Sequence, residues 1–217
     1  MRKQFLILLV LFSFNFAVAQ TSGPDSTEKS YAPYLHPEYH FNVEYNPGFT
    51  VWALGEEESI VISTGFSWFS RKRAAEFVIP VFIEATTHKS DWFDLDYKGS
   101  AVTVDLRYRE YLMGKIGGLF GAFGISWHYL NLNRLPGTDT YITGERPSHF
   151  QANRFGFGFG AGYRAFSEGH LNWTIGIFVG SYIYSEHKDN PLLGYPWMQT
   201  VKGGMVRVQL LKFGYAW

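Results

Sequence analysis

Cysteine is absent from the 217-residue chain, and charged residues are scarce. Without cysteine the chain forms no disulfide and carries no lipid-modified N-terminal cysteine. Charged residues make up 18% of the chain, against about 25% in an average globular protein. The 19 basic and 19 acidic residues cancel, so the basic surplus of a nucleic-acid-binding protein is missing. Hydrophobic residues at 46%, with a mean hydropathy of −0.11, exclude both a disordered chain and a polytopic helical membrane protein.

The N-terminal 19 residues have the three parts of a secretory signal peptide. Arg2 and Lys3 give a positive start, residues 5–16 are apolar, and Ala17-Val18-Ala19 is a small-x-small cleavage site. The alternative is an uncleaved anchor, but the apolar part is shorter than the ~20 residues that span a bilayer. Residues 20–40 begin polar and become rich in proline and aromatics, which predicts an N-terminal periplasmic extension.

Aromatic and apolar residues alternate with small or polar ones from residue 41 onward. In Phe155–Ala165, FGFGFGAGYRA, every large apolar side chain occupies an odd position. A strand puts such residues on one face, whereas a helix scatters them. Residues 171–183 alternate in the same way, and the turn-forming residues 167–170 lie between the two runs. The pattern predicts a long hairpin.

The same reading predicts eight strands and no substantial helix. The expected strands are about 41–54, 58–70, 74–88, 100–112, 118–132, 152–166, 170–185 and 204–217. Asn46-Pro47-Gly48 interrupts the first one, which therefore either contains a bulge or begins near Phe49. Pro80 predicts a second bulge. Most of these strands reach the ~9–11 residues that a tilted strand needs to cross a bilayer.

Loop lengths and sidedness favour a membrane location for residues 41–217. After a short first connection at 55–57, short connections (71–73, 114–117, 167–169) alternate with long ones (89–99, 133–151, 186–203). Short periplasmic turns and long outer loops are typical of transmembrane barrels. We therefore expect an all-β, eight-stranded antiparallel up-and-down transmembrane β-barrel. The alternative is a soluble barrel or sandwich, whose apolar face would point inward.

Short motifs resemble the small outer-membrane β-barrel proteins of Bacteroidota, including a barrel family known only as a domain of unknown function. They are Asp105-Leu106-Arg107-Tyr108, residues 118–122 and residues 159–164. The alternating Phe213, Tyr215 and Trp217 look like the C-terminal recognition strand of outer-membrane proteins. The resemblance implies the outer membrane of a Gram-negative bacterium and no known activity. Outer-membrane lipid and the insertion machinery are the expected partners, with a surface or periplasmic protein as a further possibility.

A set of charged and titratable residues is expected to face the interior of the barrel. Its members are Glu76, Glu84, Asp105, Arg107, Arg109, His128 and Arg164. They form either a structural network that plugs the interior or a path for an ion or substrate. Eight strands leave room only for side chains, and buried charges need partners, so we expect the plug, with opposite signs paired between the third and fourth strands.

His128 and a loop acidic cluster are the remaining candidates for chemistry. His128 and Asn131 resemble part of the motif of outer-membrane lipid A deacylases, but Leu130 stands where the serine nucleophile would be. The loop cluster comprises His88, Asp91, Asp94 and Asp96. It lacks the glycine-centred spacing of an EF-hand, so we expect a solvated loop. We predict no cofactor, metal or catalytic residue and a structural or surface-interaction role. A lipid-modifying enzyme and a narrow pore are the alternatives.

Overall fold

The computed structural model describes residues 39–47, 59–86, 97–134, 148–167, 170–187, 200–201 and 204–217, all within one compact unit of residues 32–217. The predicted signal peptide (1–19) and residues 20–38 of the predicted extension lie outside these residues. The strands are β1 (Phe41–Tyr45), β2 (Ser59–Ser70), β3 (Ala75–Thr86), β4 (Tyr97–Tyr111), β5 (Gly118–Arg134), β6 (His149–Phe166), β7 (Leu171–Ser185), β8 (Thr200–Val201) and β9 (Gly204–Ala216). Among the described residues, no helix is both long and apolar enough to cross a membrane.

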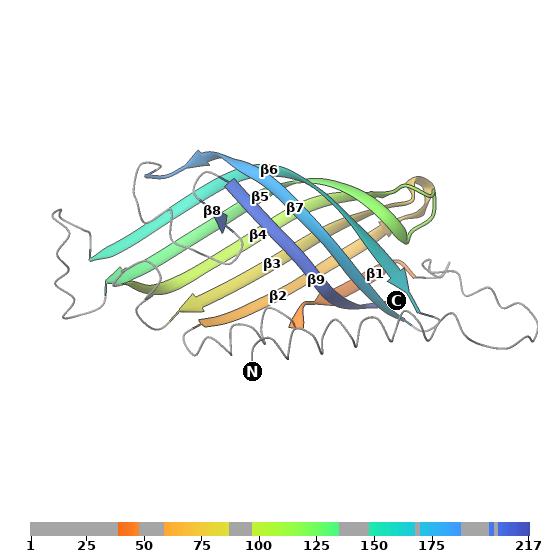
Figure 1. Ribbon diagram of the computed structural model, residues 1–217, viewed down its shortest axis with the longest axis horizontal. Coiled ribbons are helices and arrows are strands. Elements are labelled where there is room, and N and C mark those ends of the chain that lie inside the picture. The colour runs from red at the N-terminus through yellow and green to blue at the C-terminus, as the bar shows by residue number, and fades with distance from the viewer. Residues whose placement is uncertain are drawn as a thin grey trace, which may run out of the picture. The chain divides into compact units, whose positions relative to one another are not determined.

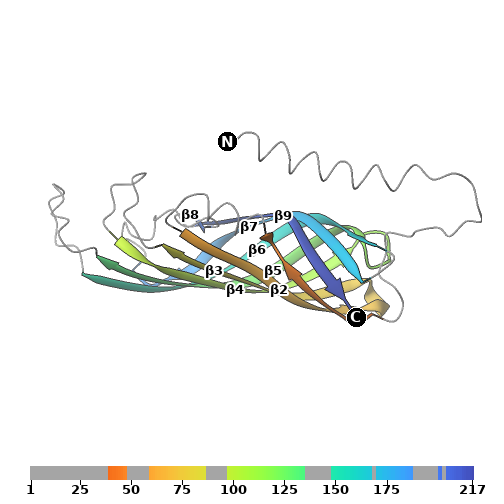
Figure 2. The ribbon, with the colours of Figure 1, turned by 90° about the horizontal axis from the view of Figure 1, so that it is seen from below.

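Eight of these strands form a closed antiparallel ring (Figures 1 and 2). Each strand pairs with the next in the chain from β1 to β7, and β7 then pairs with β9. The ring closes where β9 pairs with β1, for example Ala216 with Asn42. The two-residue β8 pairs only with β9. The all-β, antiparallel, eight-stranded part of the prediction is confirmed.

The strands are staggered around the ring. The offset is seen by stepping from each residue to its direct partner on the next strand of the ring. From Asn42 on β1 these steps lead around the ring to Met205 on β9. Asn42 itself, however, pairs with Ala216 of β9. Such an offset on closure makes the strands tilt against the axis of the ring. Residues at one level inside the ring therefore come from different depths in each strand.

The first strand begins before Pro47, at Phe41, so the alternative start near Phe49 is wrong. β1 ends at Tyr45, and the chain between β1 and β2 covers residues 46–58, of which 48–58 lie outside the described residues. The two chain ends of the ring meet, since Trp217 N donates to Phe41 O at 3.0 Å. We call this the short-turn end, because the connections 71–74, 112–117 and 167–170 lie there. The other end is the long-loop end.

The bulge predicted at Pro80 is wrong, and two bulges lie elsewhere. Pro80 pairs with Gly65 in an unshifted register, and the β3–β4 ladder merely skips Ile79 and Pro80 while keeping the same register on both sides. Proline lacks the N–H that the ladder needs, but the strand stays straight. The register shifts instead between β6 and β7 next to Phe155, and between β7 and β9 next to Leu211, whose φ is 52°.

Side chains on the outside of the ring are apolar over most of its length. Exposed outward residues include Ile62, Ile83, Leu106, Ile125, Phe159, Ile177 and Val208. A row of aromatic residues crosses the outer face from strand to strand: Trp68, Phe77, Tyr108 and Phe123, with ring centroids 5.2–5.4 Å apart. The strands contain the alternating pattern that sequence predicted, with the large apolar residues outward.

The interior holds an apolar layer at each end. At the short-turn end a cluster of buried side chains, the apolar plug, fills the ring; it contains Phe69, Ala74, Tyr111, Ile116, Phe120, Phe166 and Ala216. Near the long-loop end lies the apolar mouth layer: Val61, Ala101, Leu130, Leu132, Phe150 and Ala152, all buried. Between the two layers most inward side chains are polar or charged, with a few apolar ones such as Phe82 and Phe178 among them.

Candidate functional site: a charged network inside the ring

Glycines on β6 and β7 make room for the network. Gly156, Gly158, Gly160 and Gly162 point inward, in phase with Arg154 and Arg164. A Cβ on Gly158 would lie 2.5 Å from the Val179 carbonyl oxygen and 2.6 Å from a ring carbon of Phe178. Phe178 is itself inward and buried, and the Arg107 guanidinium lies 4.0 Å from its ring centroid. Small residues on one wall thus accommodate large cationic side chains from the opposite wall.

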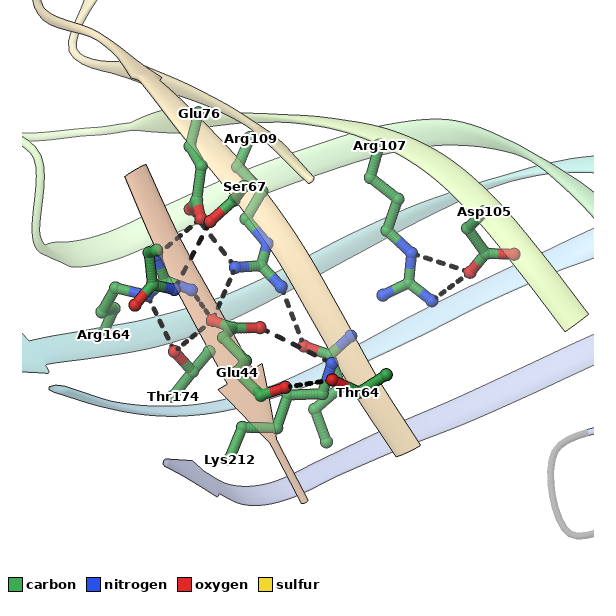
Figure 3. A network of polar contacts seen from close by, with 12 residues as sticks. Glu44, Thr64, Ser67, Glu76, Asp105, Arg107, Arg109, Arg164, Thr174 and Lys212 are labelled. Atoms are coloured by element: carbon green, nitrogen blue, oxygen red, sulfur yellow. Dashed lines mark hydrogen bonds and ion pairs between the residues drawn. The ribbon is translucent and has the colours of Figure 1, made fainter. Parts of the chain in front are cut away.

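The centre of the network is a closed cycle of alternating charges, the Glu–Arg square (Figure 3). Arg164 binds Glu44 Oε1 through Nη2 and Glu76 Oε1 through Nη1, the latter at 2.6 Å. Arg109 Nη1 lies 3.3 Å from Glu76 Oε2 and 3.5 Å from Glu44 Oε1. All four side chains are buried, and they come from β1, β3, β4 and β6. Glu76 and Arg109 lie on the paired strands β3 and β4, and the square links these two strands to β1 and β6, with which they do not pair.

Neutral side chains add hydrogen bonds to the square. The Tyr111 hydroxyl, part of the apolar plug, donates to Glu76 Oε2 at 2.7 Å. Arg164 Nε donates to Thr174 Oγ1 at 2.8 Å, and Arg109 Nη2 donates to Gln209 Oε1 at 3.2 Å. Buried charges are stable only when their hydrogen-bonding capacity is largely met, so these contacts offset part of the cost of desolvation.

A second group, the Asp105 cluster, lies beyond the square toward the long-loop end. Asp105 accepts from Arg107 Nε at 3.0 Å and from Arg207 Nη1 at 2.7 Å. Arg207 Nη2 also donates to Ser126 Oγ at 2.7 Å. One carboxylate therefore serves two guanidinium groups, from β4 and from β9 on the opposite side. Both clusters thus combine an ion pair along one wall with an ion pair across the interior, Arg164–Glu76 in the square and Arg207–Asp105 here.

His128 lies next to the Asp105 cluster, and its Nδ1 is 3.0 Å from the Thr103 hydroxyl. A hydroxyl beside an imidazole is the arrangement of a nucleophile and its base. Both side chains are buried inside the ring, with exposures of 1% and 4%, and His128 Nε2 has no hydrogen-bond partner. The neighbouring Arg154 guanidinium lies 3.7 Å from the ring centroid of Tyr182. The pair is thus covered on every side and faces neither the outer surface nor a described opening.

Comparisons with models of protein families, with curated proteins and with solved structures found no match. The site must therefore be judged from its own chemistry. Within the described residues there is no group of three or more His, Asp or Glu side chains able to hold a metal ion. The acidic loop cluster of His88, Asp91, Asp94 and Asp96 lies outside those residues.

Six of the seven residues expected inside the ring are buried there: Glu76, Asp105, Arg107, Arg109, His128 and Arg164. Glu84 is half-buried and lies in the mouth layer, paired with Val61 and Ala101. The expected pairing between the third and fourth strands exists for Glu76 and Arg109. Asp105 instead binds Arg107 on its own strand and Arg207 on β9.

The buried polar residues that the predicted set missed include Glu44, Arg154, Arg207, Gln209 and Lys212. Alternation identifies Glu44 between Val43 and Tyr45, and Arg207 between Val206 and Val208, once the strand bounds are known. Alternation alone does not identify Lys212 as an inward residue, because the bulge next to Leu211 shifts the inward positions of β9 from odd to even numbers. Phe213, Tyr215 and Trp217 consequently point outward and are exposed.

Proposed function

We propose that the chain is a small outer-membrane β-barrel protein with a structural or surface-interaction role and no catalytic activity. The observation that carries this proposal is the sidedness of the ring. Exposed outward positions are occupied by large apolar residues, while the interior buries Glu, Asp, Arg and Lys. A water-soluble barrel has the opposite arrangement, whereas lipid outside and charge inside is the arrangement of transmembrane barrels.

The strand lengths support crossing of the bilayer. The seven strands β2 to β7 and β9 contain 12 to 18 residues each. A strand tilted by about 45° needs ~9–11 residues to cross the hydrocarbon core. On β4, β5 and β6 the outer face becomes polar toward the long-loop end, with Lys98, Asn133 and Gln151 exposed. These longer strands therefore have length to spare for a polar part outside the bilayer.

The filled interior supports a role without catalysis or conduction. The apolar plug, the two ion-pair clusters and the apolar mouth layer follow one another along the ring. A pore needs a continuous polar path, and a lipid-cleaving site needs a nucleophile that faces lipid. The apolar plug and the apolar mouth layer interrupt such a path. His128 and Thr103 are buried inside the ring and do not face lipid.

Export through a cleaved signal peptide at 1–19 and insertion by the outer-membrane machinery belong to the same proposal. The exposed Phe213, Tyr215 and Trp217 on the last strand support it, since a C-terminal strand with outward aromatics is what that machinery would receive. Outer-membrane lipid is then the main partner, and the long-loop end is where a surface protein would bind.

The test is the behaviour of the protein in cells and on gels. The folded protein should fractionate with outer membranes, and unheated samples should migrate differently from boiled samples on SDS gels, because a closed sheet in lipid resists the detergent. Recovery as a soluble periplasmic monomer with heat-independent migration would overturn the proposal.

The two alternative functions have separate tests. A His128→Ala variant should leave the lipid A species unchanged by mass spectrometry; a change would favour the lipid-modifying enzyme. The purified protein should give no conductance steps in planar bilayers; reproducible steps would favour the narrow pore.

A further inference from the structure

We propose that the interior of the ring binds one halide ion beside Lys212. The first observation is an imbalance of buried charge. Among the described residues the two clusters contain three buried carboxylates, Glu44, Glu76 and Asp105. They contain five buried cations: Arg107, Arg109, Arg164, Arg207 and Lys212. The buried Arg154 and the half-buried Glu84 add one charge of each sign, so two positive charges remain in excess.

An excess of buried positive charge destabilises the folded state when the interior contains little water. Each unpaired ion loses several kcal/mol of hydration that only a nearby opposite charge restores. In the Asp105 cluster two guanidinium groups share one carboxylate, and the guanidinium of Arg107 also stacks on Phe178. The lysine has no such delocalised charge, so the remaining imbalance is most acute at its ammonium group.

Among the described residues, Lys212 has one carboxylate nearby, that of Glu44, and the contact is long. Its side chain is fully buried, and its Nζ lies 3.6 Å from Glu44 Oε2, which is beyond hydrogen-bond distance. The other oxygen of Glu44 is already shared by Arg164, Arg109 and Thr174. Lys212 Nζ itself has no hydrogen-bond partner. An ammonium group has three N–H donors, so at least two remain to be satisfied.

Gln209 Nε2 and Ser63 Oγ are two further buried donors without a hydrogen-bond partner among the described residues. Gln209, which precedes Lys212 across the bulge, gives its Oε1 to Arg109 and leaves Nε2 unpartnered. Ser63 is fully buried and its Oγ is unpartnered. Ser63 pairs with Phe82, whose ring centroid lies 5.6 Å from Lys212 Nζ, so the lysine extends across the interior toward β2 and β3.

The chemistry of these groups selects a small monovalent anion. Lys212 Nζ, Gln209 Nε2 and the Ser63 hydroxyl can all donate, and buried donors left without an acceptor are costly. Large buried side chains such as Arg109, Arg164 and Phe82 line this part of the interior, which favours a small anion over phosphate or a carboxylic acid. Chloride or bromide fits because it is monatomic, accepts several hydrogen bonds and cancels one of the two excess charges. The inference depends on the interior of the ring and not on the proposed membrane location.

The test compares halide with a large anion during folding. Wild-type protein and variants are refolded from urea into detergent in sodium bromide, sodium chloride or sodium gluconate at equal ionic strength. Thermal unfolding is then followed by tryptophan fluorescence. The wild type should unfold at a higher temperature in bromide and chloride than in gluconate, because a ligand that binds only the folded state stabilises it.

Variants locate the site. Lys212→Met removes the charge, leaves the Glu–Arg square balanced, and should abolish the halide dependence. Lys98→Met, the same substitution at an exposed position, should retain it in full. Ser63→Ala keeps every charge and removes one donor, so the bromide concentration for half-maximal stabilisation should rise about tenfold. Halide dependence that persists in Lys212→Met would overturn the proposal.

Crystals grown in bromide give a result that does not depend on any variant folding. Diffraction at the bromine absorption edge should show one anomalous peak in contact with Lys212 Nζ. A wild type that is equally stable in all three salts, with no anomalous peak beside Lys212, would mean that only water occupies this position, and the proposal would be wrong.

Discussion

The middle of the ring and the long-loop ends of β4, β5 and β6 are built with opposite sidedness. In the middle, Leu106 and Ile125 are exposed outward while Asp105 and Arg107 are buried inside. Farther along the same strands, Asn133 and Gln151 are exposed outward while Leu132 and Ala152 are buried inside. Figure 1 shows these three strands extending farthest from the C-terminal end of the ring.

With the middle of the ring in lipid, as proposed, the surroundings of each segment would explain which face carries the apolar residues. A strand that continues from lipid into water keeps its alternation but exchanges the two classes of residue. In the proposed membrane region ion pairs stabilise the interior, because moving an apolar side chain from lipid into the interior gains little free energy from the hydrophobic effect. In the polar region the interior is held by ordinary apolar packing. The two regions should therefore respond differently to matched substitutions.

The largest effect is expected when the Glu–Arg square in the middle region is broken. Glu76→Leu leaves Arg109 and Arg164 each with one carboxylate and removes the acceptor of the Tyr111 hydroxyl. The expected loss is about 3–5 kcal/mol of unfolding free energy, measured by urea titration in phospholipid vesicles. Glu110→Leu, on the exposed face of β4, serves as the control and should cost little. Equal costs for the two variants would contradict the bracing role of the square.

Removal of an apolar side chain from the mouth layer tests the other region. Leu132→Ala deletes part of a fully buried side chain and should cost about 2–5 kcal/mol of unfolding free energy. Leu106→Ala, at an exposed outward position of the middle region, should cost less, because lipid fills the space and no cavity remains. The two values come from the same vesicle titration, and a larger cost for Leu106→Ala would show that the mouth layer is not a packed core.

Arginine on the outer face of β5 tests where the lipid ends. Ile125→Arg should cost about 2–4 kcal/mol of unfolding free energy in vesicles, and Asn133→Arg about 0–1 kcal/mol, because the cost of a lipid-facing charge falls toward the interface. Both positions are exposed, and they lie on the same strand. Similar costs at both would place them in the same solvent and remove the basis for the membrane proposal.

A methyl group on the glycine wall should have the smallest effect of the four. Gly158→Ala forces Phe178 away from its position under Arg107, at a cost of about 1–3 kcal/mol of unfolding free energy. Gly121→Ala places its methyl group outward, where nothing lies within 4 Å, and should change the same free energy by less than about 0.5 kcal/mol. A neutral Gly158→Ala would mean that this wall has room to spare.

The strands and their two faces could be predicted because alternation is a local property of the chain. Phe155–Ala165 defines both faces of β6 without any knowledge of its neighbours. The partners of each charge could not be predicted, because they depend on register and on closure of the ring. Arg207 reaches Asp105 only because β9 closes the ring, and Lys212 faces inward only because of a bulge. The first strand was predicted to continue to residue 54, whereas β1 ends at Tyr45, just before Pro47, and residues 48–54 lie outside the described residues.

The bulge at Leu211 makes the length of β9 as important as its composition. Before it, odd-numbered residues such as Arg207 lie inside; after it, odd-numbered residues such as Phe213 and Trp217 lie outside. Insertion of one residue between Leu211 and Lys212, with the bulge kept, would retain every amino acid and yet exchange the two faces of residues 212–217. A lysine would then face outward, and three aromatic rings would enter an interior that the apolar plug already occupies. Deletion of Leu211 would instead remove the bulge and leave these faces as they are, so the C-terminal segment should tolerate changes of residue far better than an insertion.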